Sequence, residues 1–579
     1  MIKTKDADLT SRQTVFYFLI ILVGLFLRWY HIDQRPFHHD ESLHAVYGAY
    51  NYFSPEHNFY KYSALLHGPL LYDLLPYFYE MLGATDFAAR SLITLIGSLF
   101  LLVPLLFRHK LNSKTLIYLT TILAVSPLLV YYSRFLREDF LVLSTMMGML
   151  YAVVTDKERI KGPLFLCSLS LHYCVKENVF ITMALLLGFL AYDAFINLFL
   201  KQEKEISKLW KFLKGHWLST LIGFASAVFI FCYIYSARFR YSKGIIDGLY
   251  RDSLLYWLNQ HNVERIKGPF AFQFLMISWY DFYFILLMIF FFFHSFYKMK
   301  SQLKWYSLGS IVMSFVMYFL CNQHMLETNS IFLFFKLKIP FDLWWLILLV
   351  PHSIIITTHH MLSKQKDLAW FSYLFYASFF TYSYVGEKVP WLALYPLVFG
   401  LIYFAVYFDH YFTNRNNEIV NLGLIFIGLF TLRICLITNF NRGGDETELI
   451  SQVHTTKEFH SVMKKIRDRM VSPTKLNSKA LITGDAVWPA TWYLFNEPDY
   501  HYYDQGVAKD EYPFVIENYM SAVNLDKSHR KITLKLRGWW VPEYNDLNIK
   551  NYLNYVITHR PWSPVGHSFV DFYLKKDFN

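Results

Sequence analysis

Charged residues are scarce in this 579-residue chain: Asp, Glu, Lys and Arg make up 17% of it, whereas hydrophobic residues make up 55%. A soluble domain of this length needs a larger charged share on its surface. Apolar runs centred on residues 15–27, 282–293 and 422–436 match segments that cross the roughly 20-residue hydrocarbon layer. The sequence therefore predicts an α-helical polytopic membrane protein.

Several other features are also missing. There is no C-x-x-C pair and no zinc-ligand spacing among the cysteines, so we expect neither a disulfide framework nor a zinc site. No G-x-G-x-x-G or G-K-[ST] loop occurs, which leaves direct use of ATP or a nucleotide-sugar unsupported. No internal repeat is visible, which disfavours a secondary transporter. The five cysteines are Cys167, Cys174, Cys232, Cys321 and Cys435.

The net charge of +11 raises the possibility of a nucleic-acid partner, but its distribution argues against one. Basic residues gather in short loops between apolar runs, as the positive-inside rule requires of cytoplasmic loops, and the exception is the basic segment 238–267. This pattern predicts a cytoplasmic N-terminus in the cell (inner) membrane and no nucleic acid. The basic loops are 3–12, 108–114, 157–161, 201–214, 298–304 and 364–366.

Hydropathy predicts about thirteen membrane helices between residues 14 and 439, and an odd number places the C-terminus outside the cell. The first run is expected to remain uncleaved, because Arg28 follows it in place of a cleavage site. After residue 440 the hydropathy falls, and β-like runs at 480–483, 500–503, 532–536 and 555–557 alternate with helical patterns. We expect a transmembrane domain over 1–439 and a small α/β extracytoplasmic domain over 440–579. The expected exterior loops are 31–87, 131–139, 174–178, 237–271, 322–340 and 385–392.

The densest polar cluster follows the first apolar run and contains His38, His39, Asp40, Glu41 and His44. Adjacent carboxylates beside imidazoles at a membrane surface cost desolvation and repulsion, so such clusters often serve a function. One carboxylate could act as a general base that deprotonates an acceptor hydroxyl. A solvated acidic loop explains the same residues, and so does a divalent-metal site that includes His67.

Three further exterior clusters pair carboxylates with cations. Arg134, Arg137, Glu138 and Asp139 lie together, and a guanidinium fits phosphate oxygens while a carboxylate can hold a sugar or acceptor. Lys176 with Glu177, and Lys388 within 386–392, offer a counter-charge for a lipid phosphate. Interfacial or structural ion pairs are the competing explanation. Between the clusters, an apolar stretch from His67 to residue 82 is expected to form an amphipathic helix.

These segments, in this order, resemble the GT-C superfamily of membrane glycosyltransferases. The match is to its protein O-mannosyltransferase and lipid A aminoarabinose-transferase type. The segments that carry it are 38–44 (HHDESLH), 67–69 (HGP), 133–139 (SRFLRED) and 386–392 (GEKVPWL), and they look closer still to a bacterial and archaeal branch labelled flippase-activity-associated. The resemblance is strongest over 25–180. The C-terminal part resembles only that branch, through 488–493 and 560–564.

The resemblance implies a role for each cluster. Asp40 maps onto the superfamily's proposed catalytic base, and Glu41 would support it. Sugar or acceptor binding falls to Glu138, Asp139, His39 and His67. The candidates for phosphate binding are Arg134, Arg137, Lys176 and Lys388, and the resemblance does not distinguish among them.

The expected function is transfer of a sugar from a polyprenyl-phosphate donor in the membrane lipid to an extracytoplasmic glycan, lipid or protein. One carboxylate base with a phosphate leaving group suffices for single displacement, which inverts the anomeric centre. The branch label supplies the alternative, a non-catalytic accessory that presents or flips a lipid-linked oligosaccharide.

Overall fold

The computed structural model of this chain describes residues 9–576 except 54–58, 201–203, 261–267, 270, 301, 313–343, 386, 413–417, 472–478, 496, 498, 503–507, 522–524 and 526. The predicted exterior loop at 322–340 lies outside the described residues, as do Cys321 and Gly386.

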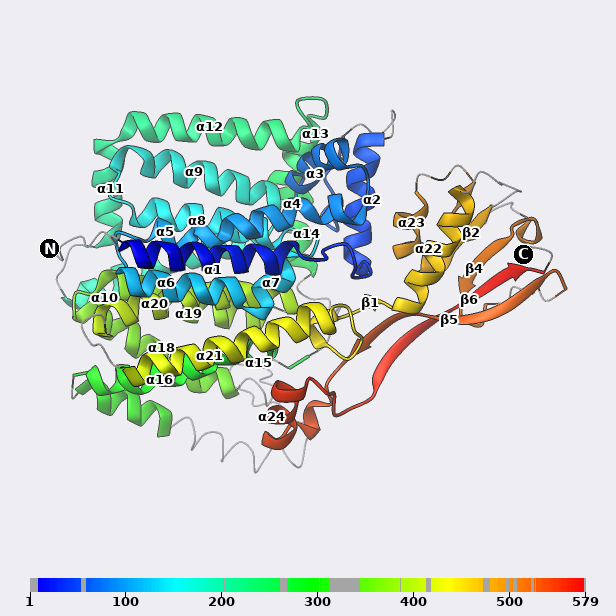
Figure 1. Cartoon of the computed structure of the whole chain (residues 1–579). Helices are drawn as coiled ribbons and strands as arrows, with labels where there is room; N and C mark the ends of the chain where they lie inside the picture. Colours follow the sequence, from blue (N-terminus) through cyan, green and yellow to red (C-terminus); the bar gives the residue numbers. More distant parts are fainter. Residues whose placement is uncertain are drawn as a thin grey trace.

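Most of the described chain is a bundle of helices that run side by side (Figure 1). Ser and Thr near helix starts, such as Thr85 before α4, cap the free amide groups there. The bundle consists of α1 (Ser11–Trp29), α4 (Asp86–Leu99), α5 (Val103–Leu106), α6 (Ser113–Val125), α7 (Pro127–Ser133), α8 (Asp139–Val154), α9 (Glu158–Val175), α10 (Val179–Leu200), α11 (Glu205–Gly215), α12 (Trp217–Tyr235), α15 (Phe272–Tyr280), α16 (Phe282–Lys298), α18 (Trp344–Leu362), α19 (Lys366–Tyr384), α20 (Leu394–Phe412) and α21 (Glu418–Leu436).

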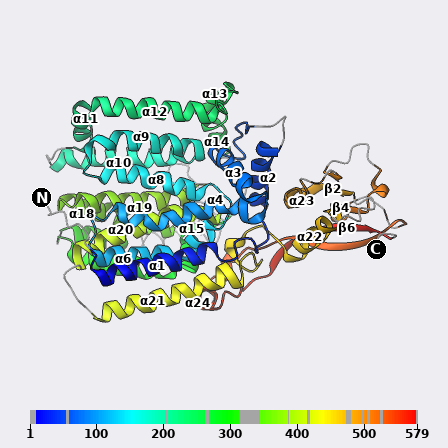
Figure 2. The same ribbon diagram turned by 45° about the horizontal axis from the view of Figure 1, so that its top comes forward.

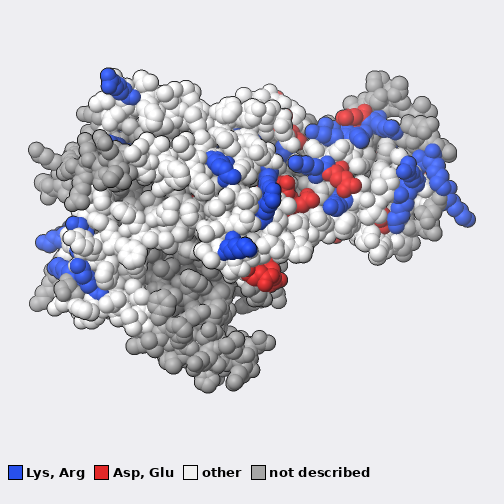
Figure 3. Space-filling model, turned by 60° about the horizontal axis from the view of Figure 1, so that its bottom comes forward, with Lys and Arg blue, Asp and Glu red and all other residues white. Residues whose placement is uncertain are grey.

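Six helical segments of the described chain are long and apolar enough to cross a membrane, or up to eight if each bent pair is one span. Large apolar side chains on them, such as Trp217, Leu221 and Phe224 of α12, are exposed, as expected for surfaces that face lipid. Figure 3 shows a broad band without charge between the charged ends. These are properties of a multi-pass membrane protein, whereas the count of thirteen spans and the sidedness stay predictions.

Short helices cover the end of the bundle that faces the C-terminal part. Helix α2 (His39–Phe53) crosses that end, with α3 (Leu70–Leu82), α13 (Lys243–Ile246) and α14 (Leu254–Gln260) nearby (Figure 1). Helix α3 buries Leu71, Tyr72 and Leu75 and exposes Tyr77 and Met81, so the predicted amphipathic stretch is a helix with two unlike faces.

The C-terminal part is a six-stranded sheet in the order β1-β5-β6-β4-β2-β3. Strand β2 is parallel to β3 and β4, and the other pairs are antiparallel. Helices α22 (Lys457–Val471), α23 (Val487–Leu494) and α24 (Ile549–Thr558) accompany it. The strands are β1 (His454–Thr455), β2 (Ala480–Ile482), β3 (Tyr500–His501), β4 (Phe514–Asn518), β5 (His529–Trp540) and β6 (Val565–Lys575).

The predicted strand at 555–557 is wrong, because these residues form the last turns of α24. Asn548 caps this helix by accepting a hydrogen bond from the Asn551 amide at 3.0 Å. Tyr555 and Val556 are buried on one face while Ile557 is exposed, so a short apolar run matched the helical period as well as it matched a strand.

The C-terminal part is docked on the bundle through buried polar contacts. The Trp492 indole donates to Asp86 at the start of α4 at 2.7 Å. Glu448, which is fully buried, accepts from Tyr280 of α15 at 2.9 Å and pairs with His559 at 3.1 Å. Figures 1 and 2 both place α23 beside α2, so the sheet and the bundle meet next to the segment that begins at His38.

Candidate active site at the end of the bundle

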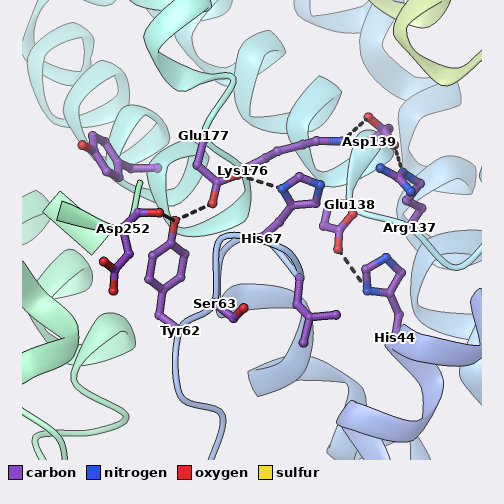
Figure 4. Close-up of polar contacts among 12 residues, drawn as sticks. His44, Tyr62, Ser63, His67, Arg137, Glu138, Asp139, Lys176, Glu177 and Asp252 are labelled. Atoms are coloured by element: carbon purple, nitrogen blue, oxygen red, sulfur yellow. Dashed lines mark hydrogen bonds and ion pairs between the residues drawn. The ribbon is translucent and has the colours of Figure 1, made fainter. Parts of the chain in front are cut away.

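Four charged side chains from three separate segments form one connected group, the site cluster: Asp40, Arg137, Asp139 and Lys176. Arg137 donates to Asp40, and its Nε donates to Asp139 at 3.1 Å. Lys176 Nζ donates to the other Asp139 oxygen at 3.0 Å (Figure 4). The cluster lies where α2, the α7–α8 connection and the α9–α10 turn meet, so it alternates two carboxylates with two cations at one end of the bundle.

The loop that follows α2 packs closely against the backbone at the end of α9, beside the site cluster. A Cβ on Gly68 would lie 2.2 Å from the Cys174 carbonyl oxygen, so only glycine fits against the end of α9. The Gly68 amide donates to the Val175 carbonyl at 3.1 Å. This contact sets His67 against Glu177, with Nδ1 and the carboxylate 2.7 Å apart.

Glu138 adds a third buried carboxylate beside the site cluster. His44 Nδ1 lies 3.3 Å from Glu138 and 2.5 Å from the Tyr72 hydroxyl (Figure 4). Neither Glu138 oxygen has a hydrogen-bond partner among the described residues, although the side chain is fully buried. Buried carboxylates normally accept hydrogen bonds, so Glu138 is suited to receive donor groups of a ligand.

Glu41, the neighbour of Asp40, belongs to a different group that we call the anchor cluster: Glu41, Arg35, Arg90 and Arg134. Arg90 donates to both Glu41 oxygens at 2.8 Å, and Arg35 donates at 3.3 Å. The Leu136 amide also donates to Glu41, at 3.0 Å. Burial alone would raise the pKa of Glu41, but Arg90 and Arg35 hold it well below its ordinary value. The Glu41 side chain is fully buried, and its hydrogen-bonding partners are all groups of the protein itself.

Arg134, the fourth member, donates to the carbonyls of Leu27 and Tyr30, each at 2.7 Å, and so fixes the end of α1. The anchor cluster thereby ties the segment around residues 35–41 to the α7–α8 connection, which carries Arg137 and Asp139. Its contacts fix the backbone segments that carry Asp40, Arg137 and Asp139.

Asp40 is the exposed member of the acidic pair, with 25% of its side chain accessible. Burial raises the pKa of this carboxyl, but Arg137 and the imidazoles of His38, His39 and His44 outweigh that effect and hold the pKa well below its ordinary value. Asp40 is therefore charged at neutral pH. A charged, accessible carboxylate can accept a proton, provided that a ligand reduces the hold of Arg137 on it.

The structure separates the predicted phosphate-binding residues into two sets. Arg137 and Lys176 lie in the site cluster, whereas Arg134 faces main-chain carbonyls at the end of α1. Lys388 donates to the carbonyls of Ser383 and Val385, the latter at 2.8 Å. Among the predicted sugar- or acceptor-binding residues, Asp139 is in the site cluster and Glu138 adjoins it. His67 lies beyond Glu138 against Glu177, and His39 faces the C-terminal part.

Two residues of the site escaped the sequence reasoning. Tyr395 donates to Asp139 at 2.6 Å, and the Trp391 ring lies under the Arg137 guanidinium, 3.8 Å from its centroid. Trp391 belongs to the predicted segment 386–392, in which only Lys388 was singled out. Tyr395 lies one helical turn after Trp391, so the helical period indicates only that these two residues share a face.

The proposed metal ligands take separate partners. His38 contacts the Gln452 carbonyl, His44 lies against Glu138 and Tyr72, and His67 pairs with Glu177. In the part of the chain that the structure describes, no group of three or more His, Cys, Asp or Glu side chains has the arrangement of a metal site.

A small apolar pocket of about 10 Å³ lies between α8, α10, α19 and α20. Met146 lies seven residues after Asp139 on α8, about two helical turns from the site cluster. The pocket therefore starts within the bundle below the site cluster. It is lined by Met146, Met149, Leu150, Thr182, Leu185, Leu186, Leu374 and Phe399.

No protein-family model matches this chain, and no curated protein matches it. The fold is similar to two crystal structures of ArnT from Cupriavidus metallidurans. The apo structure has a TM-score of 0.42 and 14% identity, over 84% of this chain and 86% of that one. The structure bound to undecaprenyl phosphate has a TM-score of 0.42 and 12% identity, over 88% and 93%.

Proposed function

We propose that this protein is a membrane glycosyltransferase that moves a sugar from a polyprenyl-phosphate donor to an acceptor at the membrane surface outside the cytoplasm. The observation that carries the proposal is the site cluster, in which an accessible carboxylate, Asp40, adjoins two cations, Arg137 and Lys176. A base for the acceptor and positive charge for a leaving phosphate are the two requirements of a single displacement.

The reaction follows from these positions. Asp40 takes the proton of the acceptor hydroxyl while that oxygen forms a bond to the anomeric carbon of the donor sugar. The bond from this carbon to the phosphate oxygen breaks, and its electron pair leaves with the lipid phosphate, which Arg137 and Lys176 stabilise. Attack from the side opposite the phosphate inverts the anomeric centre.

Donor binding also readies the base. In the structure Arg137 is shared by Asp40 and Asp139, and Lys176 is held by Asp139. A donor phosphate competes for both cations, and as Arg137 turns toward it the pKa of Asp40 rises. Asp40 then becomes a stronger base when the donor is present. Glu138 accepts no hydrogen bond from the described residues and faces only the His44 ring, at 3.3 Å, so we expect it to accept hydrogen bonds from sugar hydroxyls.

The lipid part of the donor is expected to contact apolar surface of the bundle near the site cluster. A polyprenyl chain cannot leave hydrocarbon, so its phosphate must be bound close to apolar surface. Met146, Leu185 and Phe399 line such a surface below the site cluster.

The test is sugar transfer in proteoliposomes from a panel of undecaprenyl-phosphate hexoses and pentoses to an envelope extract. We compare wild type with Asp40→Asn, and use Asp33→Asn as a matched control because Asp33 is an exposed carboxylate of the same loop. Wild type and the control should transfer sugar, and Asp40→Asn should lose roughly 100-fold or more. Full activity of Asp40→Asn would exclude Asp40 as the base. Folded wild type that binds lipid-linked glycan yet transfers no sugar would instead identify a non-catalytic accessory.

A further inference from the structure

We propose that the C-terminal sheet completes the site with a surface for a glycan acceptor, formed by Trp488 and Arg537 together with Tyr47 and His39 of α2. This inference rests on the proposed function and names the acceptor class of the same site.

The C-terminal part reaches the site through backbone contacts at its near edge. His38 forms an antiparallel bridge with His454, and its ring contacts the Gln452 carbonyl. These contacts fix β1 and β5 beside the first residues of α2, because β1 pairs with β5 at His454 and Gly538. Arg537 precedes Gly538 in β5 and pairs with Thr455. It therefore lies on the side of α2 where His39 lies.

Arg537 and His39 share one partner, the main-chain carbonyl of Trp488. Arg537 donates to this oxygen at 2.6 Å and to the Asp485 carbonyl at 2.8 Å. The His39 ring is hydrogen-bonded to the same Trp488 carbonyl. One carbonyl thus joins the C-terminal sheet to the residue that precedes Asp40.

Both side chains keep one nitrogen unused. Arg537 Nε and His39 Nδ1 are buried and have no hydrogen-bond partner among the described residues. Burial, and then the charge of Arg537, lower the pKa of His39 to about 4, so its imidazole is neutral at physiological pH. In the neutral imidazole the nitrogen facing the Trp488 carbonyl carries the proton, so His39 Nδ1 is an acceptor while Arg537 Nε is a donor, a combination that binds neighbouring sugar hydroxyls.

An aromatic pair continues the surface along α2. The rings of Tyr47 and Trp488 are stacked, with centroids 6.2 Å apart and planes inclined by 22°. Both residues are half-buried, so each presents part of its ring outward. Tyr47 lies seven residues after Asp40, about two turns or ~10 Å along one helix face. An acceptor in contact with both the rings and Asp40 is therefore extended, as an oligosaccharide is.

The other acceptor classes fit less well. A peptide that adds to a sheet needs a free strand edge, and β1, the edge strand that meets α2, already receives the bridge from His38, whereas β3 lies at the opposite edge of the sheet. A lipid acceptor needs apolar surface, whereas the surface beside Asp40 combines Arg537 and His39 with aromatic rings. Aromatic faces bordered by planar hydrogen-bonding groups suit the apolar face and hydroxyl edge of a sugar ring.

The experiment separates the acceptor classes and the role of each residue. Full-length protein in nanodiscs receives a radiolabelled undecaprenyl-phosphate sugar and one of three fractions of the envelope: soluble glycans released by mild acid, delipidated protein, or glycan-free lipid. Trp488→Ala, Arg537→Gln and Arg537→Lys are compared with Arg530→Gln, a control that removes an exposed arginine from the same strand. Label is expected in the glycan arm alone, and label confined to the protein or lipid arm would overturn the inference.

The kinetic split tests the residues themselves. Trp488→Ala and Arg537→Gln should raise the KM for the glycan fraction roughly tenfold or more while leaving the donor KM within about twofold. Arg537→Lys should recover part of the loss, and Arg530→Gln should match wild type. An unchanged glycan KM in both variants, or an equal change in donor KM, would overturn the inference.

A binding measurement keeps this inference separable from the reaction. The glycan fraction, tagged with a fluorophore, is titrated with wild type, Trp488→Ala and Arg530→Gln without donor. Binding that is weakened only in Trp488→Ala supports the surface even if no transfer is found, in which case the proposed function alone fails. Equal binding by all three proteins overturns the surface whatever the activity.

Discussion

The anchor cluster and the site cluster share two segments, the one that leads into α2 and the α7–α8 connection, yet their surroundings differ. Glu41 has no exposed side-chain area and is surrounded by Arg90, Arg35 and the Leu136 amide. Asp40, the preceding residue, is 25% exposed and is held by Arg137. Successive helical residues point about 100° apart. One turn of α2 can therefore direct one carboxylate into the scaffold and its neighbour toward a ligand.

The largest effect should come from breaking the anchor cluster. Glu41→Ala removes a buried carboxylate and leaves Arg90 without its charge partner, which should cost about 3–5 kcal/mol of stability. Thermal unfolding in detergent, followed by tryptophan fluorescence, measures this. Asp40→Asn is the matched variant and should unfold close to wild type. A folded Glu41→Ala protein with unchanged Tm would remove the distinction between the clusters.

The next effect distinguishes the cations of the two clusters. Lys176→Gln should weaken binding of undecaprenyl phosphate roughly 10-fold to 100-fold, because a charge-assisted contact to the phosphate is lost. Arg134→Gln should chiefly lower Tm, since Arg134 donates to carbonyls at the end of α1. Binding titrations and unfolding curves on both variants check this. If Arg134→Gln lost more phosphate affinity than Lys176→Gln, the two roles would be exchanged.

A smaller effect concerns pH. The charge of Arg137 lowers the pKa of Asp40, so in wild type the base stays ionised below the ordinary aspartate value of about 4. Arg137→Gln removes the largest lowering charge, so the acid limb of kcat/KM should move to higher pH, by about 1–3 units. The kcat/KM of wild type and the residual kcat/KM of the variant, both recorded from about pH 3 to pH 8, test the shift. An acid limb that moved to lower pH would contradict the pairing.

The smallest effect should come from Tyr395→Phe, which removes one hydroxyl that donates to Asp139. Loss of a single hydrogen bond to a charged group predicts a decrease in kcat/KM of roughly tenfold. Tyr382→Phe is the control, because its ring stacks on Tyr395 at 4.7 Å between centroids and its hydroxyl faces Asn178 at 3.5 Å. Equal losses in the two variants would indicate a packing effect.

Features formed by residues close together in the sequence could be predicted, whereas contacts between distant residues could not. Asp40, Asp139 and Lys176 stand in short polar segments between apolar runs, and such segments are visible by inspection. Helix α3 and the starts of β2 and β3 also followed from local patterns. The helical part, with its long apolar segments, was the clearest signal of all.

The sequence did not indicate which groups each of these side chains contacts. Arg134 and Arg137 belong to one motif, and only the packed structure sends the first to the end of α1 and the second to Asp40. Tyr395 meets Asp139 across 256 positions of the chain, and no local pattern carries such a contact. The strand predicted at 555–557 failed because its three apolar residues fit either period.

The bridge between His38 and His454 has a consequence for biosynthesis. His38 belongs to the first loop to be made, and its partners at Gln452 and His454 emerge only after the helical bundle has been synthesised. Asp40 and Glu41 are therefore synthesised well before the residues that contact His38. This side of the candidate site can form only after the C-terminal part has been made, and a chain that ends within the bundle lacks it.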